Sequence, residues 1–141
     1  MASKKTSRQI EEAAQRLKIA GMRPTRQRVA LASLLFRGGD RHLTAESLHG
    51  EAARAGHSLS LATVYNTLNQ FTQAGLLRQV TVDGSRAYFD TNTGDHQHFY
   101  CEDDGSLIDI PGETIRVAGL PAPPKGMSLD RVDVVVRVRR N

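Results

Sequence analysis

A polar helix directly before a hairpin is the feature that most constrains the fold of this chain. Residues 60–74, SLATVYNTLNQFTQA, have the apolar spacing of a helix, with Ser60 placed to cap it and Gly75 to end it. Its apolar face comprises Leu61, Val64, Leu68 and Phe71, and its uncharged polar face comprises Thr63, Asn66, Gln70 and Gln73. Such a helix is either an ordinary amphipathic helix whose polar side meets water or one suited to a DNA groove, and its neighbours decide between the two.

The neighbouring elements predict a winged helix. Two strand-like runs, 77–82 and 86–90, flank Asp83-Gly84, a dipeptide that favours a tight hairpin turn. Helical spacing and caps also predict three earlier helices, over residues 7–20, 25–36 and 45–55, the last capped by Thr44. Together these elements predict an α+β fold, with an N-terminal winged-helix domain followed by a small α/β domain.

In a winged helix, the second helix of the helix-turn-helix lies in the major groove and the hairpin follows the DNA backbone. Thr63 and Asn66 have side chains that can hydrogen-bond to base edges, and the Tyr65 ring can pack on a thymine methyl group. Residues 60–74 contain no Lys or Arg, so phosphate contacts must come from nearby arginines, each of which could equally be ordinary solvated surface. The candidate DNA-contacting residues are Ser60, Thr63, Tyr65 and Asn66 in the helix and Arg23, Arg26, Arg28, Arg78 and Arg86 around it.

Charge divides the chain in the same place as the predicted elements. Residues 1–90 contain 13 Lys and Arg against 7 Asp and Glu, whereas residues 91–141 contain 6 against 8. A basic first part suits phosphate binding, although solvated surface charge would give the same count. We therefore expect a DNA-binding domain over 1–90 and a second domain with a different task over 91–141.

The second part contains a cluster of histidines and acids. Residues 95–109 hold five acids, two histidines and no cation. His96 and His98 are two apart, so on a strand both imidazoles share one face, and Asp90 and Asp109 could add oxygen ligands. Mixed imidazole and carboxylate ligands suit Zn²⁺, Mn²⁺ or Fe²⁺. The ordinary alternatives are a solvated loop for the histidines and a buried apolar role for Cys101.

The second part is also too small to form a large core alone, which favours a homodimer. Its last strand alternates, with Val132, Val134, Val136 and Val138 on one face. These valines could pack within one chain, but a two-fold dimer would also suit a palindromic operator. Residues 120–126, LPAPPKG, predict a stiff connector.

Composition excludes several classes of protein. The sequence has no transmembrane run, and its first residues lack the apolar stretch of a signal peptide, so we expect a cytoplasmic protein with no membrane partner. Cys101 is the only cysteine, which excludes an intrachain disulfide and a multi-cysteine zinc site within one chain.

Long motifs in both parts resemble the ferric uptake regulator (Fur) family of metal-responsive transcription regulators. They are GMRPTRQR, RHLTAESL, SLATVYNTLNQFTQAGLL, YFD and DHQHF. The ending, with LIDIP, LPAPPKGM and RVDVVVRVRR, resembles the iron response regulator (Irr) branch of alpha-proteobacteria. The resemblance implies iron-responsive control of iron and haem homeostasis genes, by a homodimer on an A/T-rich palindromic operator.

The resemblance also implies the ligands of one divalent metal per subunit, Fe²⁺, Mn²⁺ or Zn²⁺, in a regulatory site between the two domains. The matching residues are His42, Asp90, His96, His98 and Asp109. The family's four-cysteine structural zinc is predicted absent, because Asp104 stands where a second cysteine would follow Cys101. Haem stays open, because Cys101 is followed by Glu102 and Gln97 interrupts the histidine run, although His96 and His98 could still ligate iron.

Two other functions compete with a metal-responsive regulator. One is a constitutive DNA-binding protein with a degenerate metal site, favoured by the missing cysteines and Gln97. The other is a metallohydrolase using the His/Asp cluster, which the sequence disfavours because no further general base, nucleophile or cofactor loop is evident. We therefore expect that the chain is not an enzyme.

Overall fold

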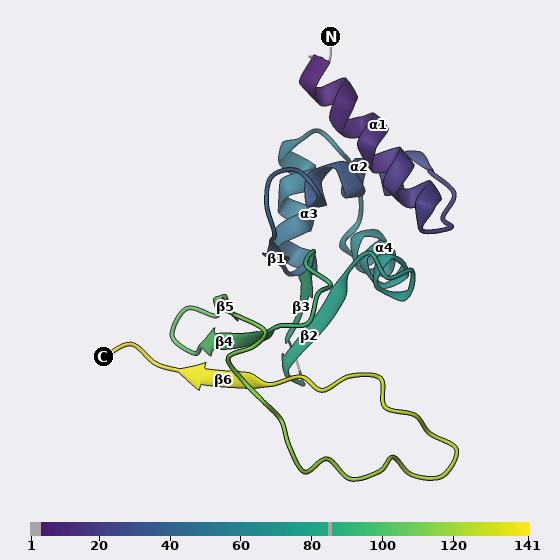
Figure 1. Cartoon of the computed structure of the whole chain (residues 1–141). Coiled ribbons are helices and arrows are strands. Elements are labelled where there is room, and N and C mark those ends of the chain that lie inside the picture. The colour runs from purple at the N-terminus through teal and green to yellow at the C-terminus, as the bar shows by residue number, and fades with distance from the viewer. Residues whose placement is uncertain (1–3, 85) are drawn as a thin grey trace. The chain divides into compact units, whose positions relative to one another are not determined.

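A computed structural model of the chain describes residues 4–84 and 86–141 (Figure 1). The chain divides into two compact units, the first ending at Thr93 and the second beginning at Gly94. The first unit combines four helices with a small sheet and the second contains a sheet of its own, so the α+β class predicted from the sequence is confirmed. None of the described helices has the length and apolar character that crossing a membrane requires.

Four helices form most of the first unit, at the positions that the sequence predicts to within a few residues. Three of them begin at a hydroxyl cap: Thr25, Thr44 and Ser60 each accept a hydrogen bond from the backbone N–H three residues later. Thr44 also receives the reciprocal bond of a capping box, because the Ser47 hydroxyl accepts from its N–H. The helices are α1 (Lys4–Ile19), α2 (Arg26–Leu35), α3 (Ala45–Arg54) and α4 (Leu61–Gln73).

The core of the first unit lies between these helices, and α4 contributes Val64, Leu68 and Phe71, all fully buried. The prediction that Leu61 joins this stripe was wrong, since 41% of it is exposed. Leu61 is the first residue of α4, and its Cα–Cβ bond is tilted toward that open end of the helix. Thr67 is buried instead, with its hydroxyl donating to the Thr63 carbonyl at 2.8 Å.

A three-stranded antiparallel sheet completes the first unit. Its strands are β1 (His42–Leu43), β2 (Arg78–Asp83) and β3 (Arg86–Asp90), in the order β1-β3-β2. β2 and β3 form the predicted hairpin, and the Asp83 carboxylate accepts from the Arg86 N–H at 3.1 Å. β1 was not predicted. It pairs Leu43 with Phe89, both in the core, and His42 with Asp90.

The second unit is built on the three strands β4 (Gln97–Cys101), β5 (Leu107–Ile110) and β6 (Val135–Val138), in the order β5-β4-β6. β5 runs antiparallel to β4 and β6 runs parallel to it, with residues 111–134 as the crossover. The Gln97 amide holds the approach to β6, because its Oε1 accepts from the Val134 N–H at 2.6 Å and its Nε2 donates to the Val132 carbonyl at 3.3 Å.

Candidate metal centre and nucleic-acid interface

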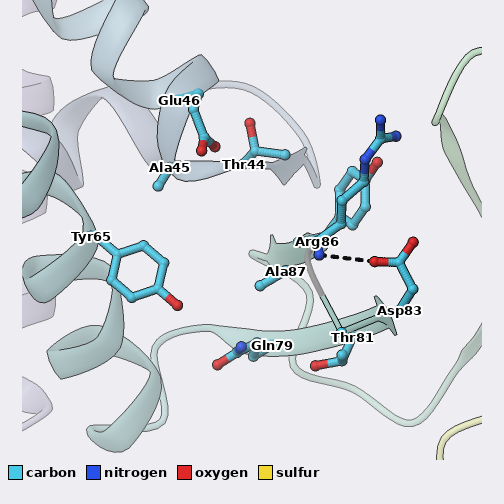
Figure 2. A pocket seen from close by; sticks show the side chains of 11 residues that line it. Thr44, Ala45, Glu46, Tyr65, Gln79, Thr81, Asp83, Arg86 and Ala87 are labelled. Carbon is cyan, nitrogen blue, oxygen red and sulfur yellow. Dashed lines mark hydrogen bonds between the residues drawn. The ribbon is translucent and has the colours of Figure 1, made fainter.

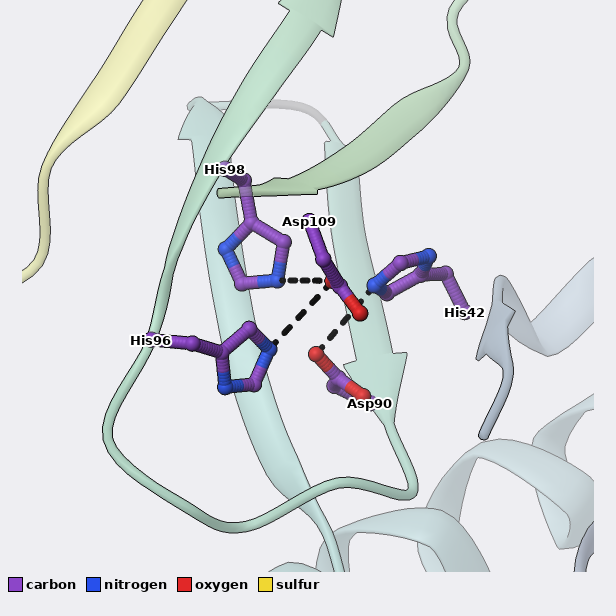
Figure 3. A group of neighbouring side chains, drawn as sticks. All are labelled: His42, Asp90, His96, His98 and Asp109. Atoms are coloured by element: carbon purple, nitrogen blue, oxygen red, sulfur yellow. Dashed lines mark ion pairs between the residues drawn. The ribbon is translucent and has the colours of Figure 1, made fainter. Parts of the chain in front are cut away.

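Two of the predicted metal ligands lie together in the first unit. His42 of β1 and Asp90 at the end of β3 are partners in the antiparallel ladder, and their Nε2 and Oδ2 atoms are 3.3 Å apart (Figure 3). Asp90 is fully buried, and its Oδ1 accepts from the Asn92 N–H at 2.9 Å, which fixes the carboxylate. We call His42 and Asp90 the first half-site.

The other three predicted ligands lie together in the second unit. His98 of β4 is the ladder partner of Asp109 of β5, and His96 precedes β4. The Nε2 atoms of both histidines lie 3.4 Å from the same Asp109 oxygen, Oδ1, and the rings are 4.6 Å apart (Figure 3). His96 and His98 are buried. We call these three residues the second half-site.

The hydrogen bonding of His96 favours a cation at the second half-site. Its Nδ1 lies 2.8 Å from the Gly94 carbonyl, which can only accept, so Nδ1 carries the proton. In a neutral ring, Nε2 then presents a lone pair to the Asp109 carboxylate. The Nε2 lone pair and the carboxylate are two facing acceptors, which need either an additional proton or a shared cation between them. A histidine that ligates a metal usually donates from its other ring nitrogen to a carbonyl or carboxylate, as His96 does here. The donor set therefore fits a divalent metal.

Gly112 positions the loop that carries His96. A Cβ atom at Gly112 would collide with the backbone carbonyl oxygen of Asp95, the residue before His96. The turn after β5 can thus pack on this loop only because residue 112 has no side chain. Sequence reasoning missed this role, since the contact joins segments on either side of a hairpin.

Asp104, at the position where the resemblance would place a second cysteine, joins the β4–β5 turn to the end of the chain. Its carboxylate accepts from the N–H and hydroxyl of Ser106, at 3.0 and 2.6 Å, and pairs with Arg140 Nη2 at 2.6 Å. These contacts, those of Ser106 first, hold the pKa of Asp104 well below its usual range. Cys101 is buried, as its ordinary apolar role requires.

The polar face of α4 presents the residues predicted to contact DNA bases. Asn66 is exposed and 44% of Tyr65 is exposed, whereas Thr63 is half-buried. The Ser60 hydroxyl is already engaged, accepting from the Thr63 N–H at 3.0 Å and donating to its Oγ1 at 2.9 Å. The edge of the Tyr65 ring meets the buried Phe89 ring, with centroids 6.3 Å apart and planes at 86°.

A pocket of about 490 Å³ lies beside Tyr65, between α4, the start of α3 and the hairpin (Figure 2). Thr44 and Glu46 border it from α3, and Gln79 and Thr81 border it from β2. Sequence reasoning missed these two β2 residues as possible DNA contacts. The alternation of polar and apolar residues over 79–83 was the signal that could have identified them.

The predicted phosphate-contacting arginines differ in their surroundings. Arg23, Arg26 and Arg86 are exposed. Arg28 is half-buried and donates to the Arg23 carbonyl at 2.9 Å and to Gln70 Oε1 at 3.2 Å, so it braces α2 against α4.

The predicted phosphate contact of Arg78 needs correction. Only 5% of Arg78 is exposed. It is the ladder partner of Asp90, and because successive residues of a strand point to opposite faces, it points away from the face of Gln79 that borders the Tyr65 pocket. Arg78 therefore lies outside the exposed surface that the predicted DNA contacts require, although it is the first residue of the hairpin.

Comparison with known proteins identifies the family of this chain. The sequence profile of the Ferric uptake regulator family matches residues 19–135. The ferric uptake regulation protein of Pseudomonas aeruginosa is 37% identical over 95 residues, which cover 67% of this chain and 71% of that protein. The peroxide-responsive repressor PerR of Staphylococcus aureus is 34% identical over 102 residues, covering 72% and 68%.

Solved structures of ferric uptake regulators have the same fold. The Pseudomonas aeruginosa regulator solved with manganese has a TM-score of 0.67 at 29% identity, covering 91% of this chain and 97% of that one. The Vibrio cholerae regulator has a TM-score of 0.69 at 24% identity, covering 90% and 98%. The resemblance stated from the motifs is thereby confirmed at the level of the family, and the chain belongs to the ferric uptake regulator family of metal-responsive transcription regulators.

Proposed function

We propose that this chain is an iron-responsive regulator of the Irr type, which controls iron and haem homeostasis genes. The observation that carries the proposal is the convergence of His96 and His98 on one oxygen of Asp109, in the same chain as a winged helix. Its relatives include both iron-uptake and peroxide-responsive regulators, so family membership alone does not select the signal. The C-terminal motifs LPAPPKGM and RVDVVVRVRR support the Irr branch.

The two half-sites together hold one divalent ion, Fe²⁺, Mn²⁺ or Zn²⁺, in each subunit. Each of the five side chains offers one ligand atom, an imidazole nitrogen or a carboxylate oxygen. The first half-site has two ligands and the second has three, so neither alone fills four positions. Asp90 and His96 are six residues apart, which limits their Cα separation to about 21 Å even in a fully extended chain. The manganese in the Pseudomonas aeruginosa structure supports a metal of this class.

The two domains have different tasks, in line with the basic charge of residues 1–90 and the acidic charge of residues 91–141. Residues 1–90 form the DNA-binding domain, and residues 91–141 form the dimerisation and metal-binding domain of a homodimer. Base contacts come from Thr63, Tyr65 and Asn66 on α4, with Ser60 fixing the start of that helix. Phosphate contacts come from the exposed Arg23, Arg26 and Arg86, while Arg28 supports α4 from α2. Two-fold symmetry then matches an A/T-rich palindromic operator.

Binding of the ion changes DNA affinity only if the protein conformation that holds the metal binds DNA with a different affinity from the metal-free conformation. The test is a DNA-binding titration on a palindromic A/T-rich duplex, with protein that is metal-free, loaded with Fe²⁺, Mn²⁺ or Zn²⁺, or loaded with haem. We expect one of these ligands to change the affinity, and His98→Ala to abolish the change. His57→Ala, which removes a histidine outside both half-sites, is the matched control.

Three results would contradict the proposal. Metal or haem that binds without changing DNA affinity removes the sensing role. Absence of bound metal and haem under every loading condition favours the constitutive DNA-binding protein with a degenerate site. Metal-dependent hydrolytic turnover that His98→Ala abolishes favours the metallohydrolase.

A further inference from the structure

Arg41 connects the first half-site to the helices of the winged helix. Its guanidinium donates from Nη1 to the Leu34 carbonyl at 2.8 Å, and from Nη2 to both carboxylate oxygens of Glu51 at 2.9 and 2.7 Å. Leu34 lies in the last turn of α2, and Glu51 lies in α3. One side chain therefore holds two helices together, and it belongs to the residue directly before His42.

The backbone of Arg41 is bonded to the residue directly after Asp90. Its N–H donates to the Thr91 hydroxyl at 2.8 Å, and the Thr91 N–H donates to the Arg41 carbonyl at 3.0 Å. The next pair along the strands is His42 and Asp90. The contacts between Arg41 and Thr91 thus extend the ladder of β1 and β3 by one pair, and each of the two residues adjoins a metal ligand.

On its other side, the ladder reaches the helix that faces DNA. The pair after His42 and Asp90 is Leu43 and Phe89, both packed in the core. Phe89 is the ring against which Tyr65 of α4 packs. A shift of His42 and Asp90 together therefore moves neighbouring pairs that are attached to α2 and α3 at one end and to α4 at the other.

We propose that Arg41 is the positioning residue through which the first half-site acts on the helix-turn-helix. The inference rests on the proposed function, because it concerns the same metal site and its effect on DNA affinity. The described side-chain bonds of Arg41 go to Leu34 and Glu51, neither of which is a predicted metal ligand or DNA contact. His42 and Asp90 already lie 3.3 Å apart, so the role of Arg41 is to make α2 and α3 follow the ladder when metal binding moves this pair as a unit.

The side chains that make this connection are partly shielded from water, with 27% of Arg41 and 16% of Glu51 exposed. Arg41 donates from Nη1 to one helix and from Nη2 to the other, and neither lysine nor glutamine reproduces this planar fork. Arg37 also approaches Glu51, but at 3.9 Å and with 50% of its side chain exposed. Arg37 thus carries the same charge to the same carboxylate but belongs to neither strand of the ladder.

The test compares Arg41→Gln with Arg37→Gln, which removes an equal charge. The readout is the ratio of DNA dissociation constants without and with saturating Mn²⁺, measured beside the Mn²⁺ affinity of the DNA-free protein. Couplings between two binding sites are typically about 5- to 150-fold, and we expect Arg41→Gln to reduce this ratio to within about twofold of one. The metal-free DNA affinity and the Mn²⁺ affinity stay within about threefold of wild type, and Arg37→Gln keeps the wild-type ratio.

Glu51→Gln is the second variant, and it should reduce the ratio as Arg41→Gln does, with no further loss in the double variant. If Arg41→Gln fails to fold by circular dichroism, Glu51→Gln alone decides the matter. A wild-type ratio in the folded variants overturns the inference, as does a loss of metal-free DNA affinity as large as the loss with metal. A wild-type protein that binds Mn²⁺ without any change in DNA affinity overturns the proposed function, and this inference with it.

Discussion

At the scale of single residues, Gly112 should control metal affinity although it is not a ligand. Gly112→Ala would force the Asp95 carbonyl, and with it the loop that carries His96, away from its position. Loss of a group that orients a ligand typically lowers metal affinity by about 10- to 100-fold, and we expect a decrease of that order in a calorimetric titration with Mn²⁺ or Zn²⁺. Gly39→Ala is the control, because a Cβ there meets nothing within 4 Å. Unchanged affinity in Gly112→Ala would show that the loop adapts freely.

Asp104 should make the stability of the protein depend on pH. Its pKa is lowered in the folded protein by Ser106 and Arg140, so its stabilising effect is complete above the usual carboxyl pKa of 3.8 and is lost as the pH falls further. Between pH 5 and 8, we expect Asp104→Asn to lower the unfolding temperature by a constant amount. Below about pH 4, the difference in unfolding temperature between the two proteins should shrink. Thermal unfolding of both proteins from below pH 4 to pH 8 is the measurement, with the exposed Asp130→Asn as control. A difference that grows on acidification would contradict the assigned contacts.

At the scale of elements, α4 should recognise sequence through Tyr65. Tyr65→Ala removes a half-exposed ring that lies beside the pocket of Gln79 and Thr81 and is held in place by Phe89. We expect affinity for the operator to fall by about 1–3 kcal/mol, as for loss of one base contact, with little change on unrelated duplex DNA. Fluorescence anisotropy on both duplexes measures the two affinities. Tyr65→Phe keeps the packing on Phe89 and tests the hydroxyl alone, and equal loss on both duplexes in Tyr65→Ala would count against a base contact.

The regular elements of the first unit were predictable because their signals are local. Thr25, Thr44 and Ser60 cap helices that begin one residue later, and Asp83-Gly84 marks the hairpin turn. Strand β1 was missed, because two residues carry no periodicity and exist as a strand only through their pairing with β3. The same pairing brings His42 to Asp90, a contact that residue spacing did not reveal and that the family resemblance alone implied.

Orientation across an element was harder to predict than its existence. Arg78 has the right charge and lies at the start of the hairpin, but the alternation of residues 79–83 puts it on the buried face of Val80 and Val82, a consequence that the prediction from charge overlooked. Residues to which we assign a supporting role without ligation or DNA contact, such as Arg41, Thr91 and Gly112, were also missed. Their contacts, 7 to 50 residues apart in the sequence, join different helices, strands and loops, and nothing in the residues themselves marks them.

At the scale of the whole molecule, the ligand set divides between two compact units, and this has a consequence for stability. The first half-site is formed by β1 and β3, and the second by β4, β5 and the loop before β4. If five ligands share one ion, metal binding stabilises both units at once. A ligand present at 100 times its dissociation constant adds about 2.7 kcal/mol to the free energy of unfolding.

His42→Ala should therefore separate the responses of the two units to metal. In the wild-type protein, we expect saturating Mn²⁺ to slow amide hydrogen exchange in residues 86–91 as well as in residues 96–110, because ligands from both regions are held by the same ion. In His42→Ala, the second half-site still offers three ligands, so metal should protect residues 96–110 and have a much smaller effect on residues 86–91. Hydrogen exchange followed by mass spectrometry measures both regions in one experiment, and His57→Ala should respond as the wild type does. Protection confined to residues 96–110 in the wild-type protein would mean that the second half-site holds the metal alone, and that His42 and Asp90 serve only to pair β1 with β3.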